Sequence, residues 1–217
     1  MKRHRGPLRK RKSHLWVRQK QDWYVEPLWV SLRLFELEHF GAVWDPACGS
    51  GRIVDAARAH GIYSLGSDIV KRTDSEFCRG RKDFFEHKHV YWCGIVSNPP
   101  FSRAEEFAKH ALKLLRRSKI REHGGKLALL LPSNWIQGTR RSRWLASTPL
   151  VRVYFICPRP AMPPGHIKKP TGNGTTDYAW YIWNTGLKRR RQPVIDWLYR
   201  DPEPSPRKTP VLPARSR

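Results

Sequence analysis

A glycine turn between a short apolar run and an amphipathic segment constrains the fold of this chain more than any other feature. The run 42–45 is typical of a short buried strand, and Gly49-Ser50-Gly51 follows it closely. Residues 52–60 then carry apolar side chains at helical spacing, and Gly61 is placed to end that helix. A strand, a glycine turn and a helix in this order predict one unit of an open α/β sheet, whose working edge lies at the carboxyl ends of its strands.

The same alternation continues along the chain. Ser102 with Glu105 three residues later has the capping-box pattern and predicts a helix to about residue 117. We expect a single α/β domain with a seven-stranded, mostly parallel sheet and helices on both faces. The expected strands cover residues 42–45, 63–68, a segment ending near 82–85, 90–96, 126–132, 151–156 and 178–183, with further helical segments at 27–40 and 139–144.

The charge of the chain indicates a polyanionic partner. Lys and Arg number 42 against 18 acidic residues among 217, a formal charge of +24, which concentrates nucleic acid around a protein without reading its sequence. Ribosome association, attraction to a membrane surface and merely basic tails are the alternatives. Residues 1–21 are expected to be a flexible basic arm, 22–186 the domain, and 187–217 a basic, proline-rich extension.

The cysteines indicate neither a metal site nor a disulfide framework. Cys48, Cys78, Cys93 and Cys157 are scattered without CxxC spacing, which fits a reducing compartment. No apolar stretch is long enough to span a bilayer, and no signal-peptide core follows the basic amino terminus. We therefore expect a cytoplasmic protein without a bound metal, whose oligomeric state the sequence leaves open.

The glycine turn does not have the pattern of a dinucleotide site. That pattern requires a third small residue at position 54, where this chain has Val54. A ligand without a phosphate, with a positive charge and hydroxyl groups, can instead be held by a glycine turn with carboxylates. Asp68 lies 17 residues after Gly51 at the end of the next expected strand, close to the offset of a carboxylate that binds ribose hydroxyls.

The run Ser97-Asn98-Pro99-Pro100-Phe101 follows the fourth expected strand and suits chemistry on a planar amine. The lone pair of an exocyclic aromatic amine is conjugated into its ring. The side-chain carbonyl of Asn98 and the backbone carbonyl of Pro99, held rigid by Pro100, can accept hydrogen bonds from both amine protons. Phe101 can stack on an extruded base, a contact worth about 1–3 kcal/mol. The alternative is an ordinary Pro-Pro turn.

These two motifs, Asp-Pro-Ala-Cys-Gly-Ser-Gly at 45–51 and Asn-Pro-Pro-Phe at 98–101, resemble those of S-adenosylmethionine-dependent amino-methyltransferases. The resemblance is greatest to the adenine-N6 methyltransferases of bacteria and their phages, and it covers roughly residues 23–183. It implies a Rossmann-like class I methyltransferase domain, S-adenosylmethionine as cofactor and methyl transfer to the N6 amine of adenine in DNA. It also implies that Asn98, Pro99, Pro100 and Phe101 form the catalytic turn.

The resemblance further implies how the cofactor is held. Asp45 and the turn 47–51 would contact its methionine portion, and Asp83 would accept from its adenine amine, with Phe84 packed on the ring. The segment 23–27 is similar to the family motif that closes over the methionine end. The resulting cofactor residues are Glu26, Pro27, Asp45, Ala47, Cys48, Gly49, Gly51, Asp68, Asp83 and Phe84.

Two of these assignments have alternatives. Asp74 and Glu86 compete with Asp83, because the segment that holds all three lacks clear periodicity. The segment 23–27 is also compatible with a hydrophobic staple in front of a helix.

Candidate contacts to the polymer lie in the second half of the chain. Asn134 and Trp135 follow the fifth expected strand and are placed to line a base pocket, although Trp135 is equally compatible with the core. Basic residues of the next helix and of the loop 159–169 are candidates for phosphate contacts, with a solvated basic surface as the alternative. They are Arg140, Arg141, Arg143, Lys168 and Lys169.

The candidate substrates can be ranked from the recognition domain that the chain lacks and from the residue at position 101. Sequence-specific DNA enzymes of this kind carry a sizeable recognition domain, for which this chain has no room, so little or short sequence specificity is expected. Phe101, in place of Tyr, is shared with several RNA methyltransferases. DNA adenine is therefore favoured, RNA adenine comes second, and a protein amide comes last. A catalytically silent fold that binds nucleic acid is the alternative from another class.

Overall fold

The computed structural model describes residues 22–90, 94–118, 125–165, 174–187 and 192–201. The expected basic arm 1–21, most of the expected extension 187–217, and the candidate contacts Lys168 and Lys169 lie outside these residues.

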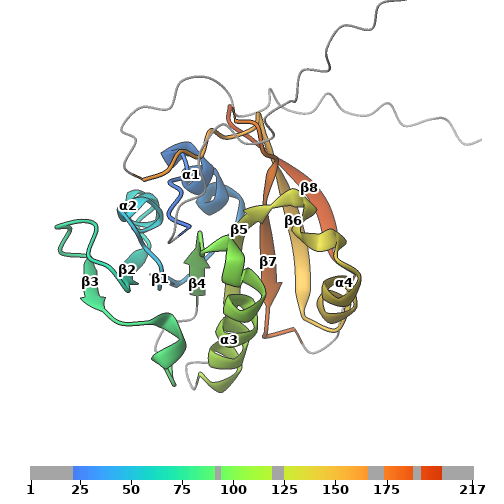
Figure 1. The fold of residues 1–217 in the computed structure, drawn as a ribbon, viewed down its shortest axis with the longest axis horizontal. Helices are drawn as coiled ribbons and strands as arrows, with labels where there is room; N and C mark the ends of the chain where they lie inside the picture. The colour runs from blue at the N-terminus through green and yellow to red at the C-terminus, as the bar shows by residue number, and fades with distance from the viewer. Residues whose placement is uncertain (1–21, 91–93, 119–124, 166–173, 188–191, 202–217) are drawn as a thin grey trace, which may run out of the picture.

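One mixed sheet forms the centre of the molecule, in the order β3-β2-β1-β4-β5-β7-β6-β8 (Figure 1). Strand β7 runs antiparallel to its neighbours β5 and β6, and the other neighbouring pairs are parallel. The strands are β1 (Ala42–Asp45), β2 (Tyr63–Asp68), β3 (Cys78–Arg81), β4 (Gly94–Ser97), β5 (Lys126–Pro132), β6 (Leu150–Cys157), β7 (Tyr178–Asn184) and β8 (Val194–Tyr199).

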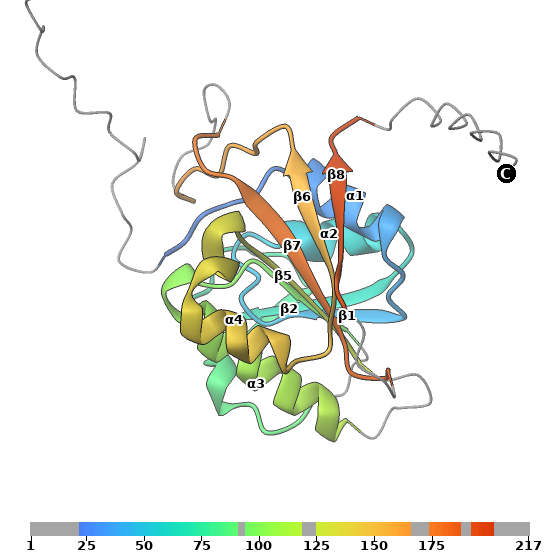
Figure 2. The ribbon, with the colours of Figure 1, turned by 90° about the vertical axis from the view of Figure 1, so that its right-hand side faces the viewer.

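Two pairs of helices cover the two faces of the sheet. Helices α1 (Leu28–Leu37) and α2 (Arg52–Ala59) pack on one face, and α3 (Ala104–Arg117) and α4 (Thr139–Ala146) lie on the other (Figure 2). Residues 127–131 of β5 are all apolar because both faces of this strand are buried. Leu127 and Leu129 join the core under α3, and Ala128 and Leu130 join the core under α1 and α2. The expected two-sided α/β architecture is therefore present.

The expectation of seven strands is wrong, because the sheet has an eighth strand, β8, at its edge. It pairs in parallel with β6, from Arg152 with Val194 to Cys157 with Tyr199. Of its side chains Leu198 is buried, while Val194 and Ile195 remain more than half exposed. Because so few of its side chains are buried, β8 has no clear alternation of apolar and polar residues. Residues 194–199 were therefore expected in the extension 187–217.

Two local expectations also differ from the structure. Helix α3 begins at Ala104 without a side-chain cap, and Ser102 lies in the short 3-10 turn Phe101–Arg103 that precedes it. The capping box is therefore wrong, and the Glu105 carboxylate instead pairs with the Lys109 ammonium at 2.7 Å. The third strand ends at Arg81, and a 3-10 turn, Phe84–Glu86, follows it where the strand end was expected.

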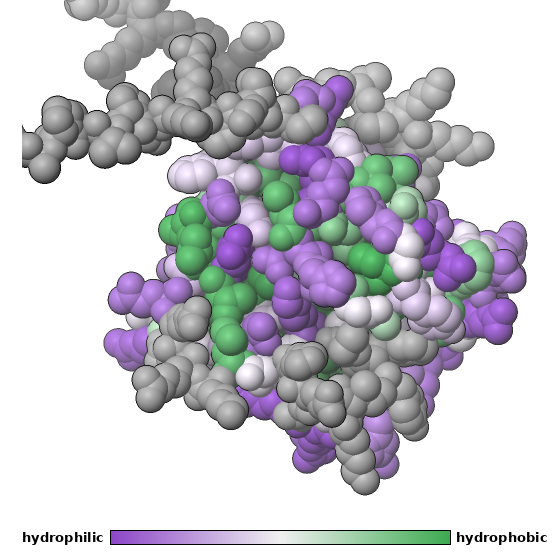
Figure 3. All heavy atoms as spheres, turned by 180° about the vertical axis from the view of Figure 1, so that it is seen from behind, coloured by the Kyte–Doolittle hydropathy of each residue, from purple (hydrophilic) through white to green (hydrophobic). Residues whose placement is uncertain are grey.

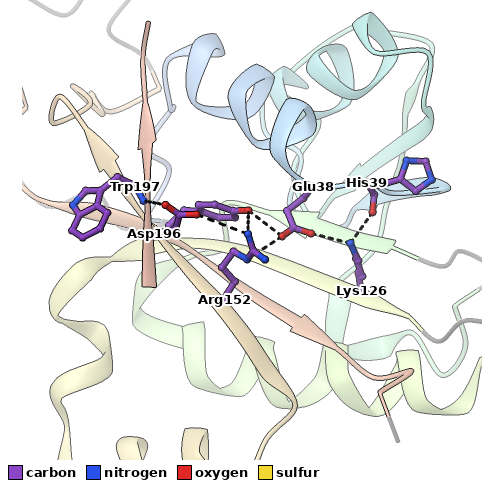
Figure 4. A network of polar contacts seen from close by, with 7 residues as sticks. Glu38, His39, Lys126, Arg152, Asp196 and Trp197 are labelled. Atoms are coloured by element: carbon purple, nitrogen blue, oxygen red, sulfur yellow. Dashed lines mark hydrogen bonds and ion pairs between the residues drawn. The ribbon is translucent and has the colours of Figure 1, made fainter. Parts of the chain in front are cut away.

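A buried carboxylate network joins the end of α1 to the sheet (Figure 4). Glu38 is 8% exposed, and its two oxygens accept from the Lys126 ammonium at 2.8 Å and from the Tyr154 hydroxyl at 3.2 Å. Arg152 lies 3.7 Å from the same carboxylate and 3.9 Å from that of Asp196. Because Lys126 is the first residue of β5, this network stabilises the sheet at the amino end of that strand.

The face that carries α1 and α2 mixes apolar and polar side chains (Figure 3). Leu28 and Leu37 of α1 are among the large apolar residues that stay exposed, as are Val194, Ile195 and Trp197 of β8. Among the described residues, no helix combines the length and the apolar character needed to cross a membrane.

Candidate active site

A cavity lies at the carboxyl ends of β1, β2 and β4, where three polar side chains meet. Asp45 ends β1, Asp68 ends β2, and Asn98 directly follows β4. Because β1 lies between β2 and β4, these residues converge at one edge of the sheet. The cavity lining includes ten of the residues singled out from the sequence: Glu26, Asp45, Ala47, Cys48, Gly49, Asp68, Asp83, Phe84, Asn98 and Pro100.

The glycine turn has a backbone that only glycine adopts easily. Gly49 has φ +51° and Gly51 has φ +89°. A Cβ on Gly49 would also lie 3.0 Å from Trp23 Nε1, and one on Gly51 would lie 2.9 Å from Cys78 Sγ. The amide of Gly49 donates to Asp68 Oδ2 at 2.9 Å, and Val70 N donates to Oδ1 at 3.0 Å. Asp68 therefore ties the turn to the end of β2.

Asp45 is 1% exposed beneath this turn. Its Oδ1 accepts from the Ser97 hydroxyl at 2.7 Å and from Ala47 N at 3.1 Å. Burial raises the pKa of Asp45 well above its usual range, and the nearby charges of Glu26 and Asp68 act in the same direction. Asp45 thus joins the turn to β4 from below the cavity.

Cys48 and Cys78, which lie far apart in the sequence, meet beside the cavity. Both sulfurs lie within 3.0 Å of the point that a Cβ on Gly66 would occupy. The hydrogen bond with Cys78, together with burial, raises the pKa of the Cys48 thiol, while that of Cys78 is lowered. Cys48 is therefore held as a neutral thiol in the lining.

The amide of Asn98 is oriented by two acceptors. Its Nδ2 donates to Tyr24 O at 2.9 Å and to Glu26 Oε2 at 2.8 Å. Because the Tyr24 carbonyl can only accept a hydrogen bond, the amide atom that faces Tyr24 and Glu26 is the nitrogen, and Oδ1 points away from them. Within the described parts of the chain, no hydrogen bond engages Oδ1 or the carbonyl of Pro99.

Glu26 is a buried carboxylate that accepts a hydrogen bond from the side chain of Asn98. It is 5% exposed, and burial raises the pKa of its carboxyl, while the hydrogen bond from Asn98 acts in the opposite direction. Pro27 lies next to it as the N-cap residue of α1, outside the cavity lining. The structure thus places Glu26 against the Asn98 amide at the cavity wall.

The segment around Trp23 closes one side of the cavity. It pairs with the loop before residue 166, since Val25 N donates to Pro163 O and Gly165 N donates to Trp23 O, both at 3.0 Å. A Cβ on Gly165 would lie 2.1 Å from the Trp23 ring, so glycine permits this close packing. The Arg72 guanidinium lies 4.2 Å from the centre of the same ring.

Aromatic rings flank the turn 98–101 and the opposite wall of the cavity. Phe101 is parallel to Tyr24, with 6.0 Å between ring centres, and lies 5.8 Å from Tyr178. Phe84 is 4% exposed and packs on Phe107 at 4.2 Å, so most of its ring belongs to the core even though it contributes to the lining.

The candidate polymer contacts occupy different environments. Asn134 is exposed, whereas Trp135 is 6% exposed and packs against Tyr181, and neither lines the cavity. The Arg141 guanidinium donates to Trp135 O at 2.6 Å and is thus engaged internally. Arg140 and Arg143 are exposed on α4.

Several lining residues were not singled out from the sequence. Arg52 follows the glycine turn directly and could have been found from that position. Arg72, Phe85 and Arg103 reach the cavity from loops and turns, so their sequence positions gave no indication. Arg103 lies 3.9 Å from the centre of the Phe85 ring and 3.9 Å from the Asp83 carboxylate.

No protein-family model matches this chain, and no match is found among curated proteins. Among solved structures, a protein from Vibrio vulnificus YJ016 assigned as a modification subunit of a type I restriction enzyme is similar, with a TM-score of 0.52 and 16% identity over 85% of this chain and 48% of that chain. A structure of a type I R-M system is also similar, with a TM-score of 0.50 and 19% identity over 80% of this chain and 44% of that chain.

A third similar structure, assigned as an RNA methyltransferase from Pyrococcus horikoshii, has a TM-score of 0.48 and 12% identity, over 74% of this chain and 81% of that one. The chain spans less than half the length of each of the two restriction-modification proteins. At these identities the similarity shows the fold, a methyltransferase-like α/β fold.

Proposed function

We propose that this chain is an S-adenosylmethionine-dependent methyltransferase that transfers a methyl group to the N6 amine of adenine in DNA, with little or short sequence specificity. One observation carries the proposal. The amide nitrogen of Asn98 is held by two acceptors, and its carbonyl oxygen is left unengaged beside a cavity rich in carboxylates.

The cavity residues suit the chemistry of this cofactor. Besides Glu26, its lining holds the carboxyl groups of Asp45, Asp68 and Asp83, which can accept hydrogen bonds from hydroxyl and ammonium groups, together with the guanidinium groups of Arg52, Arg72 and Arg103. Asp68 would bind the ribose hydroxyls, because each carboxylate oxygen has one accepted hydrogen bond and a lone pair left over. When bound, S-adenosylmethionine supplies a methyl group activated by a positively charged sulfur.

The residues of the chain then position the amine. Asn98 Oδ1 and the Pro99 carbonyl oxygen accept hydrogen bonds from the two N–H groups of the amine, which draws the nitrogen lone pair out of conjugation with the ring. Glu26 and Tyr24 prevent the amide from turning its nitrogen toward the substrate. Positioning of this kind lowers a reaction barrier by up to about 7–11 kcal/mol.

DNA is favoured over RNA because two similar structures with a TM-score of at least 0.50 come from type I restriction-modification proteins. The formal charge of +24 suits any polyanion, so it supports nucleic acid over protein. RNA adenine is the second candidate, because Asn-Pro-Pro-Phe at 98–101 is similar to the turn of several RNA methyltransferases.

The test is a methyl-transfer assay with tritiated cofactor. Unmethylated double-stranded DNA, single-stranded DNA, total RNA and protein are supplied separately, and the product nucleosides are separated. N6-methyldeoxyadenosine in the DNA reactions is the expected result. Label in RNA adenine alone would favour the second candidate, and label in protein alone, or in nothing, would refute both.

A further inference from the structure

A groove runs between α3 and α4, which lie side by side on one face of the sheet (Figures 1 and 2). Glu105 joins the two helices, since its carboxylate contacts the Lys109 ammonium of α3 at 2.7 Å and the Arg141 guanidinium of α4 at 3.4 Å. The groove is lined by Lys109, Leu112, Lys113, Arg116 and Arg117 of α3 and by Trp144, Ser147 and Thr148 at α4 and its end.

The groove carries positive charge that the protein does not neutralise. Lys113, Arg116 and Arg117 are exposed, and no carboxylate within the described ranges forms an ion pair with any of them. Lys109, by contrast, is paired with Glu105. The far half of the groove is therefore open to an anionic ligand.

The cations of α3 form a regular stripe that starts near the candidate active site. Helix α3 begins six residues after Asn98, and Lys109, Lys113 and Arg116 follow at i, i+4 and i+7 along one side. At 1.5 Å per residue the stripe is about 10 Å long. One strand of duplex DNA has a phosphate roughly every 3.4 Å along the axis, so a stripe of this length can reach more than one phosphate, with Lys113 and Arg116 as its cations that form no ion pair among the described residues.

Helix α4 borders the same groove with further positive charge. Trp144 and Ser147 line the groove, and Arg140 and Arg143 lie one turn earlier on that side by helical spacing. The side chain of Arg140 is 91% exposed, and its guanidinium lies 3.7 Å from the Glu105 carboxylate. Among the described residues, the large exposed apolar side chains lie outside α3 and α4, so this face lacks the apolar groups that insert into a lipid surface.

We propose that the α3–α4 groove binds the phosphate backbone of double-stranded DNA beside the target adenine. The inference rests on the proposed function for its choice of polymer. The groove contacts phosphates and no base edges, so it contributes affinity and register without sequence preference.

The test compares two triple variants that remove equal charge. K113Q/R116Q/R117Q neutralises the groove, and R79Q/K88Q/R200Q neutralises exposed cations on other surfaces. Glutamine keeps the helix propensity of α3. Dissociation constants are measured for several unmethylated duplexes of different sequence, between about 50 and 200 mM NaCl.

The groove variant should bind every duplex about 10- to 100-fold more weakly than the unaltered protein, and its salt slope should fall by about 2 to 3. The control variant should lose much less. Equal losses in the two variants, or an unchanged salt slope in the groove variant, would overturn the proposal. So would groove-dependent binding to phosphatidylserine vesicles or to an acidic peptide without such binding to DNA.

Affinity for S-adenosylmethionine, measured by calorimetry on the same proteins, separates this proposal from the proposed function. The groove variant should keep the affinity of the unaltered protein. If neither protein bound the cofactor, the methyltransferase assignment would fail while the DNA measurements still decided the groove. If the triple variant melted at a lower temperature than the unaltered protein, the single variant K113Q would replace it in the test. The salt slope of K113Q should fall by roughly a third as much.

Discussion

Both N–H groups of the Asn98 amide are donated inside the protein, one to Tyr24 O and one to Glu26. At the scale of single residues, this makes Glu26 a positioning residue for the proposed transfer. Burial raises the pKa of the Glu26 carboxyl, and burying a carboxylate costs free energy unless a hydrogen bond compensates for the lost water. The hydrogen bond from Asn98 provides this compensation, and it also orients the Asn98 amide.

Replacement of Glu26 by two different residues tests that role. Glu26→Ala should lower kcat by about 10²-fold, since Asn98 loses an orienting acceptor, while the affinity for S-adenosylmethionine changes much less. Glu26→Gln should recover most of the rate, because its amide oxygen can accept from Asn98. Single-turnover rates and calorimetry decide between the outcomes. An alanine variant that lost cofactor affinity and kept its rate would show that Glu26 acts on the cofactor instead.

Asp68 should dominate the affinity for the cofactor. Asp68→Ala removes an acceptor for ribose hydroxyls and the anchor of Gly49, so binding should weaken about 10- to 150-fold. The matched control is Asp74→Ala, whose side chain is 95% exposed in the loop that follows β2. Calorimetric titration measures both. Equal effects of the two substitutions would refute the ribose assignment.

Asp45 should make stability depend on pH in a defined direction. Its carboxyl pKa is raised in the fold above the ordinary value of 3.8, so the folded state binds the proton more tightly than the unfolded state does. The stability that this provides is full below pH 3.8 and is lost as pH rises through the raised pKa. Asp45→Asn, which cannot ionise, should therefore gain stability relative to the unaltered protein as the pH rises above 3.8.

Chemical unfolding at a series of pH values measures this difference. Parallel stability curves for the two proteins would show that Asp45 titrates normally.

At the scale of elements, the sequence predicts those parts whose side chains alternate between buried and exposed or are buried throughout. The glycine turn, α2, β2 and β5 are found at their expected positions for that reason. Strand β3 has the sequence Cys-Arg-Gly-Arg and is mostly exposed, so it carries no apolar pattern.

The candidate site divides in the same way. Asp45 and Asp68 end their strands and Asn98 directly follows one, so all three could be predicted from sequence, because parallel strands end at one edge. The pairing of Glu26 with Asn98 joins residues 72 apart and depends on how α1 packs, which no local pattern encodes. Trp135, by contrast, packs into the core against Tyr181, one of the two environments that its sequence position allowed.

The eighth strand should contribute to the stability of the domain. Leu198 is fully buried in the core under α1, so Leu198→Ala should lower the free energy of unfolding by about 2–5 kcal/mol. Ile195 is 60% exposed on the same strand, and Ile195→Ala should change it by about 0.5 kcal/mol or less. Thermal or denaturant unfolding compares them. Equal stability of both variants would show that β8 is not part of the cooperative unit.

At the scale of the whole molecule, one edge of the sheet gathers Asp45, Asp68 and Asn98, and cations predominate elsewhere. A formal charge of +24 attracts polyanions to a protein surface. Helix α3 begins six residues after Asn98 and carries its cations away from the cavity. In the proposed function, this arrangement would bring the polymer and the cofactor together at Asn98.

The role of Asn98 is tested most directly by methyl transfer and cofactor affinity of Asn98→Ala, with Asn184→Ala at the far end of β7 as the matched control. We expect the Asn98 variant to transfer methyl groups to DNA about 10²- to 10³-fold more slowly and to bind S-adenosylmethionine as the unaltered protein does, while the control keeps its rate. Transfer by the Asn98 variant at the rate of the control would refute the proposed role of Asn98.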